Sequence, residues 1–161
     1  MKKIFYWSPH LSNVATIKNV INSAKSIKIF NKSDHDISII DTIGEWQNQK
    51  KTLNAYRINL IKLSNYSLDK YLPVTGYFKS RFFYIYIVLA KFFPLKKILN
   101  KEKPEYLILH LVTSLPLIIL LFSNTRTKFI LRISGFPKLG FFRKILWKKV
   151  SKRLFLVTCP S

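Results

Sequence analysis

The sequence predicts a single α/β domain built on a doubly wound, mainly parallel sheet. Short apolar runs of strand length recur along its 161 residues, and segments with helical spacing or helical length lie between them. The clearest unit has apolar runs at 106–111 and 128–133 on either side of a helix-length apolar segment at 114–122. A continuous apolar run of strand length is typical of a parallel strand buried on both faces. Strand, helix and strand in that order predict a βαβ unit of a Rossmann-like sheet.

The first third of the chain predicts three more strands. Residues 3–7, 36–41 and 58–63 are short apolar runs bounded by polar or turn-forming residues. Between the first two, residues 14–27 carry apolar side chains at helical spacing, which predicts an amphipathic helix. A short polar helix is expected around 47–55.

Residues 77–99 are rich in aromatic side chains and predict a helix that is kinked or stopped before Pro94. Aromatic bulk with basic ends is typical of a helix at a membrane interface. A core helix whose lysine side chains extend to solvent is the alternative. The apolar part, 82–93, is shorter than the roughly 20 residues of a spanning helix.

The C-terminal part predicts a loop at 136–140, an amphipathic basic helix at 141–153 and a last strand at 154–158. The apolar side of this helix is expected to consist of Phe142, Ile145, Leu146 and Val150.

The charge balance is strongly one-sided. The chain has 28 Lys and Arg residues against 7 Asp and Glu residues, a formal net charge of +21. No acid follows Glu105, whereas ten basic residues do: Arg126, Lys128, Arg132, Lys138, Arg143, Lys144, Lys148, Lys149, Lys152 and Arg153. A field of one sign predicts a polyanionic partner, either nucleic acid or an anionic membrane surface. The residue usage of an AT-rich genome would explain part of the lysine content, but not the loss of acids after Glu105.

The cysteine count and the absence of several motifs argue against several classes of functional site. Cys159 is the single cysteine, so we expect no internal disulfide, no metal site and a reducing cytosolic compartment. The apolar start of the chain ends at Ser8, too early for a signal peptide. Phosphate-binding glycine loops, HExxH, GxSxG and paired acids are absent from the sequence, which argues against nucleotide-phosphate, metalloprotease and hydrolase sites.

Polar residues follow several of the predicted strands. In an open α/β sheet, ligands bind at the carboxyl ends of the strands. The candidates at these ends are Ser8, His10, Asn13, Glu45, His110, Ser134 and Gly135. His110 stands out because it closes an apolar run, and histidine is the usual general base near neutral pH. The alternative is a structural histidine bonded to a backbone carbonyl.

Several segments together resemble a known family. The segments KKIFYWSPH, DISIID, KPEYLILHLVTSLP, KFILRISGFP and LFLVTCPS, in this order, resemble the N-terminal, acceptor-side domain of family 4 glycosyltransferases, which have the GT-B fold. The resemblance spans essentially residues 1–161. It is most specific at PEYLILH, at RISG and at the terminal VTCPS.

The resemblance implies roles for individual residues. His110 matches the histidine that lies in the catalytic cleft of that family. The loop from Ser8 through His10 to Asn13 would contact acceptor or phosphate, although the glycines usual there are missing. Ser134 and Gly135 would contribute to the acceptor site.

The resemblance also implies a hexosyltransferase reaction with a nucleotide-sugar as co-substrate and no other cofactor. The domain that binds this donor is not in the sequence, so we expect no transfer by the chain alone and a possible separate donor-domain chain. The acceptor would be a glycan or a lipid-linked precursor at the cytosolic face of the cell membrane. The residues expected to contact an anionic membrane surface are Lys79, Arg81, Phe82, Phe83, Lys91, Lys148 and Lys149.

Two other function classes stay open. A basic nucleic-acid-binding protein fits the pI of about 10.2, but the aromatic residues cluster in apolar runs instead of alternating with lysines on a polar face. A small integral membrane protein would have its span at 106–122, a run that contains His110 and Pro116 and is short for spanning.

Overall fold

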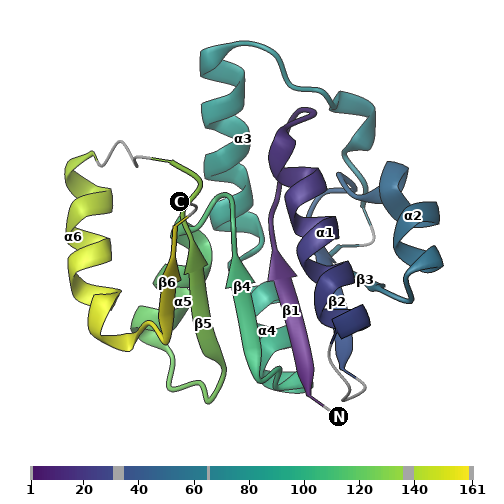
Figure 1. Cartoon of the computed structure of the whole chain (residues 1–161). Coiled ribbons are helices and arrows are strands. Elements are labelled where there is room, and N and C mark those ends of the chain that lie inside the picture. Colours follow the sequence, from purple (N-terminus) through teal and green to yellow (C-terminus); the bar gives the residue numbers. More distant parts are fainter. Residues whose placement is uncertain (1, 31–34, 65, 136–139, 160–161) are drawn as a thin grey trace.

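The computed structural model (Figure 1) describes residues 2–30, 35–64, 66–135 and 140–159. In this part of the chain, six parallel strands form one sheet with the order β3-β2-β1-β4-β5-β6. The strands are β1 (Lys3–Trp7), β2 (Asp36–Asp41), β3 (Asn59–Lys62), β4 (Tyr106–Leu109), β5 (Lys128–Arg132) and β6 (Leu156–Thr158). The strand order reverses direction between β1 and β4. The predicted doubly wound, Rossmann-like domain is therefore confirmed.

The helices divide between the two faces of the sheet (Figure 1). They are α1 (Ala15–Phe30), α2 (Lys50–Ala55), α3 (Tyr77–Ala90), α4 (Phe92–Glu102), α5 (Ser114–Phe122) and α6 (Phe141–Val150), with single turns of 3₁₀ helix at Gln47–Gln49, Asp69–Tyr71 and Ser151–Arg153. Buried side chains of α1 and α2 pack against one face. Those of α3 to α6 pack against the other.

Side chains of β1 alternate between the two faces of the sheet and contribute to the hydrophobic core on each face. Phe5 and Trp7 point to the core beneath α3 to α6, whereas Ile4 and Tyr6 point to the core beneath α1 and α2. A strand buried on both faces needs apolar side chains at every position, which explains the continuous apolar run of the sequence.

The predicted break before Pro94 in the helix at 77–99 is confirmed. The structure has two helices, α3 and α4, and Lys91 between them leaves the helical conformation with φ −103° and ψ 4°. Pro94 lies in the first turn of α4, where a missing N–H group breaks no helical hydrogen bond. The chain therefore bends before the proline, and α4 continues to Glu102.

The apolar side predicted for residues 141–153 was wrong in part. Val150 is buried, and Leu146 and Trp147 pack against the core. Phe142 is 85% exposed and Ile145 is 39% exposed. Helix α6 packs on α5 through the side that holds Leu146, Trp147 and Val150, so Phe142 at its beginning points to solvent.

Residues 106–122, the span of the alternative membrane-protein interpretation, do not form one helix. The segment consists of the four-residue strand β4, a turn and the nine-residue helix α5. Among the described residues, no helix combines the length and the apolar character that crossing a membrane requires.

One face of the second half of the sheet is open. In Figure 1, no helix of the described chain lies over the α1 side of β5 and β6. Leu156 and Phe155 are accordingly about half exposed, at 48% and 54%. By contrast, Leu107 of β4 faces the other side and is fully buried.

We expect Leu107→Ala to lower the free energy of unfolding by about 2–5 kcal/mol, the cost of a truncated core leucine. Leu156→Ala, the matched control on the open face, should cost less than about 1 kcal/mol. Urea denaturation followed by circular dichroism measures both values. An equal cost for the two variants would show that the open face is covered in solution.

Candidate functional site

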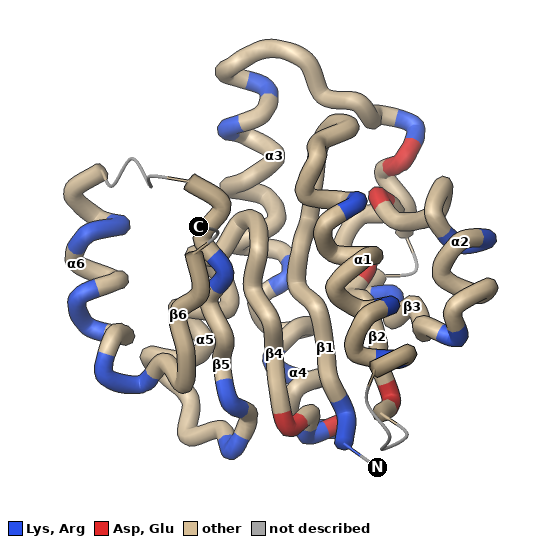
Figure 2. Tube along the Cα trace, in the orientation of Figure 1, with Lys and Arg blue, Asp and Glu red and all other residues tan. Residues whose placement is uncertain are grey.

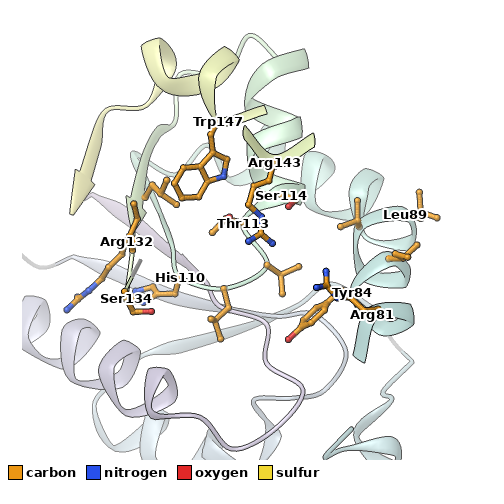
Figure 3. A pocket seen from close by; sticks show the side chains of 17 residues that line it. Arg81, Tyr84, Leu89, His110, Thr113, Ser114, Arg132, Ser134, Arg143 and Trp147 are labelled. Carbon is orange, nitrogen blue, oxygen red and sulfur yellow. The ribbon is translucent and has the colours of Figure 1, made fainter. Parts of the chain in front are cut away.

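A cleft of about 630 Å³ opens at the carboxyl edge of the sheet (Figure 3). One wall is the side of α3 that carries Arg81, Ile85 and Leu89, and α6 contributes Arg143 and Trp147 on the other side. The remaining lining comes from the turn between β4 and α5 and from the segment after β5. The cleft lies next to the place where the strand order reverses, which is where open α/β sheets bind ligands.

The turn from β4 into α5 is held by Trp7 of the neighbouring strand. The backbone N–H of His110 donates to the carbonyl oxygen of Trp7 at 2.9 Å. The indole Nε1 of Trp7 donates to the carbonyl oxygen of Val112 at 3.1 Å. Val112 has φ 47°, a left-handed conformation that is costly for a β-branched side chain and that persists only where its surroundings impose it. This strained turn brings the N-terminus of α5 to the cleft.

His110 lies directly after β4 and lines the cleft. The residue is 8% exposed, and its Nε2 has no hydrogen-bond partner among the described residues. Burial, together with the positive charge of Arg132, lowers the pKa of His110 to about 4. The imidazole is therefore neutral at pH 7, with Nε2 unpaired at the carboxyl edge.

The polar groups of the cleft are mostly donors. In Figure 3 the side chains of Arg81 and Arg143 extend from opposite walls toward Thr113 and Ser114, whereas that of Arg132 points away. Trp147 Nε1, which can only donate, is buried without a partner among the described residues. No Asp or Glu is among the described residues that line the cleft.

Ser134 and Gly135 both line the cleft and are exposed. Gly135 has φ 129°, and nothing lies within 4 Å of the position that a Cβ would take. The glycine is therefore needed for the backbone conformation and leaves the neighbouring space open.

Ser8 and His10 lie elsewhere, in a buried polar cluster beyond β1 and β2. Ser8 is 1% exposed, and its Oγ has no partner among the described residues. His10 packs edge-on against Trp46, with 4.9 Å between the ring centroids, and burial lowers its pKa. Asn13 is exposed on the loop before α1. The predicted acceptor residues therefore separate, and only His110, Ser134 and Gly135 meet in one cleft.

Two acids stabilise the turn after β2 in the same cluster. The Glu45 carboxyl accepts hydrogen bonds from the backbone N–H groups of Thr42 and Ile43. The Asp41 carboxyl accepts from Gly44 N at 2.9 Å. Burial and the neighbouring Asp41 raise the pKa of Glu45 to about 8.

The residues predicted to contact a membrane are not all exposed. Lys79, Arg81, Phe82, Lys148 and Lys149 are exposed on α3 and α6. The placement of Lys91 on this surface was wrong. Lys91 is 4% exposed at the junction of α3 and α4, where burial lowers its pKa and the nearby charges of Glu45 and Asp41 partly oppose that effect.

The placement of Phe83 on this surface was also wrong, because Phe83 packs partly buried against the core and turns away from the exposed side of α3.

We use the term outer surface for the exposed apolar residues of the two helices. They are Tyr77, Phe78, Phe82, Tyr84, Ile85, Tyr86 and Leu89 of α3 and Phe141, Phe142 and Ile145 of α6.

Basic residues accompany this outer surface. Figure 2 shows Lys and Arg positions along α6 and near the beginning of α3, and no Asp or Glu on either helix. The loss of acids after Glu105 in the sequence thus becomes a basic side of the folded domain.

Sequence reasoning missed Trp7, Val112 and Trp147 as site residues. Trp7 and Val112 act through backbone geometry, for which the sequence carries no signal. Trp147 is a tryptophan within a lysine-rich helix, and that composition was a usable sign of a role at the site.

Comparison with protein-family models, with curated proteins and with solved structures gives no match to this chain. Within the described residues, no group of three or more His, Cys, Asp or Glu side chains is placed to hold a metal ion.

We expect the imidazole of His110 to titrate with a midpoint near pH 4, which NMR of its ring C–H protons measures. An unfolded histidine titrates near pH 6.5, so the unfolded state binds more protons between these two values. His110 therefore destabilises the fold increasingly as the pH falls from about 6.5 through about 4.

The variant His110→Asn cannot be protonated and should lack this component. Relative to wild type it should gain stability on the order of a few kcal/mol between pH 7 and pH 4. Comparing the two proteins in urea cancels the contribution of the other titrating groups. A midpoint near 6.5 would mean that the imidazole is not buried in solution.

Proposed function

We propose that this chain is the acceptor-binding half of a glycosyltransferase that works at a membrane surface. The observation that carries the proposal is the cleft at the carboxyl edge, where the neutral His110 lies with Arg81 and Arg143. Such a cleft is the usual ligand site of an open α/β sheet. The resemblance of the segments around His110 and Ser134 to family 4 glycosyltransferases supports the same reading.

In the proposed reaction, His110 would accept a hydrogen bond or a proton from the attacking hydroxyl group of the acceptor. A pKa of about 4 makes the imidazole a weak base. A negatively charged ligand beside it would raise that pKa toward neutrality, because an opposite charge favours the imidazolium form. Ser134 and the open space at Gly135 leave room for the sugar beside the imidazole. The nucleotide-sugar would be supplied by a donor-binding domain.

The outer surface supports peripheral contact with a membrane. Phe78, Phe82 and Leu89 are 76%, 71% and 72% exposed, and water-exposed apolar groups in such a row mark an interaction surface. The basic residues of α6 would add roughly 1 kcal/mol each near an anionic leaflet.

Membranes that contain the protein together with its donor-binding chain should transfer labelled sugar from a nucleotide-sugar to an endogenous acceptor. His110→Ala should lower this rate by a factor on the order of 10²–10⁴, the usual contribution of a positioned acid–base group. Arg126→Ala, an exposed change outside the cleft, is the control and should leave the rate unchanged. If His110→Ala transfers sugar at the wild-type rate while remaining folded, the catalytic role is wrong.

We expect the protein to sediment with anionic vesicles at low salt and to be partly released as the salt concentration rises, because charge attraction is screened beyond about 8 Å at physiological ionic strength. The double variant Phe78→Ser/Phe82→Ser should bind vesicles more weakly. The matched control is Phe30→Ser, which removes a phenylalanine that is 83% exposed on α1. Equal losses in the two variants would mean that vesicle binding does not occur through α3.

A further inference from the structure

The donors of the cleft converge on one region. In Figure 3, Arg81 and Arg143 approach from α3 and α6 the place where Thr113 and Ser114 begin α5. The first N–H groups of a helix have no partner within the helix, and the N-cap residue Thr113 makes no side-chain hydrogen bond to them. Two guanidinium groups beside a helix N-terminus form a setting that favours a phosphate group.

Two further groups point to a ligand independently of the helix terminus. His110 is 8% exposed with Nε2 unpartnered, and Trp147 Nε1 is buried and unpartnered, both within the described residues. Both side chains line the cleft. Burying a polar group without a partner is costly, so a bound molecule whose oxygen atom reached either nitrogen after a small side-chain shift would gain a hydrogen bond. The lining described for the cleft holds no carboxylate that would repel an anion.

An apolar path leads from this polar region to the outer surface. Ile85 and Leu89 line the cleft, yet they are 55% and 72% exposed. Phe78 and Phe82 continue the same row toward the beginning of α3, at spacings of three and four residues. The row offers one side of a long hydrocarbon chain a continuous apolar contact.

We propose that the cleft binds a phosphate group that carries a long apolar chain. The phosphate lies between Arg81, Arg143 and the first turn of α5, and the chain leaves along Ile85 and Leu89 to the outer surface. The inference rests on the proposed function, since it assigns the acceptor to the lipid-linked phosphates and excludes a free polysaccharide. It also explains why one side of α3 is apolar and exposed from the cleft to the beginning of the helix.

The test uses the full chain, with decyl phosphate below its micelle concentration as the probe. Inorganic phosphate and decyltrimethylammonium are the comparison probes for the head group and the chain. The readout is the NMR resonance of the Trp147 indole N–H, assigned with Trp147→Phe. Each buried methylene increases affinity about fourfold, so decyl phosphate should bind at least about a hundredfold more tightly than inorganic phosphate. The cationic probe should leave the resonance unshifted.

Two pairs of variants separate head group from chain. Arg81→Gln and Arg143→Gln should each weaken decyl phosphate at least about tenfold, the usual loss of a charge-assisted hydrogen bond. Ile85→Ser and Leu89→Ser should weaken decyl phosphate and leave the weak binding of inorganic phosphate unchanged. Lys144→Gln removes an exposed charge beside Arg143 on α6 and is the control. Circular dichroism confirms that each variant is folded.

Equal affinities for decyl phosphate and inorganic phosphate would overturn the apolar path. Binding of the cationic probe, or arginine variants that bind decyl phosphate like the Lys144→Gln control, would overturn the phosphate site. These failures differ from failure of the proposed function. If sugar is transferred to an acceptor but decyl phosphate does not bind, the proposed phosphate site in the cleft is wrong and the proposed function is unaffected. If decyl phosphate binds but no sugar is transferred, the proposed phosphate site in the cleft is correct and the proposed function is wrong.

Discussion

The hydrogen bonds between Trp7 and the turn that follows β4 are the interactions on which the rest of the site depends. Trp7 is fully buried at the end of the central strand β1. Its carbonyl oxygen receives the N–H of His110, and its indole donates to the carbonyl oxygen of Val112. The same residue therefore fixes the end of β4 and the left-handed backbone of Val112. Without that geometry, α5 would not begin beside His110.

The two halves of the carboxyl edge differ in their chemistry. Beyond β1 and β2 the polar groups are buried, and the acids Asp41 and Glu45 satisfy backbone N–H groups of their own turn. Beyond β4 and β5 the cleft is open and rich in donors. The first arrangement stabilises a turn, because its acceptors are already occupied. The second has guanidinium groups, the unpartnered Trp147 Nε1 and space beside them, which is what recognition of an anion requires.

Helices α3 and α6 bury only part of their apolar surface, and the outer surface is the part that stays exposed. A helix that is apolar on nearly every side has more apolar area than one face of a sheet can bury, so α3 leaves Phe78, Phe82 and Leu89 exposed while Ile87 is buried. Helix α6 behaves similarly, with Val150 inside and Phe142 outside. Because both helices flank the cleft, the exposed apolar groups and the donor-rich region lie on neighbouring surfaces of the domain.

The sequence by itself determined the strands and their parallel arrangement, because strands buried on both faces require apolar runs that no other element of this length needs. The runs at 3–7 and 36–41 coincide with β1 and β2, and the segment at 114–122 coincides with α5. His110 could be placed at the end of its strand for the same reason.

Only the tertiary structure decided which polar residues meet. Ser8 and His110 both follow central strands, yet one is buried in a polar cluster and the other lines a cleft, since the neighbouring helices cover the two ends differently. Lys91 is buried and Phe142 is exposed, the opposite of what was expected, because tertiary packing sets both the helix break at Lys91 and the rotation of α6 about its axis. Arg81 and Arg143 are 62 positions apart, and only the packing of α3 and α6 around α5 brings them to the same cleft.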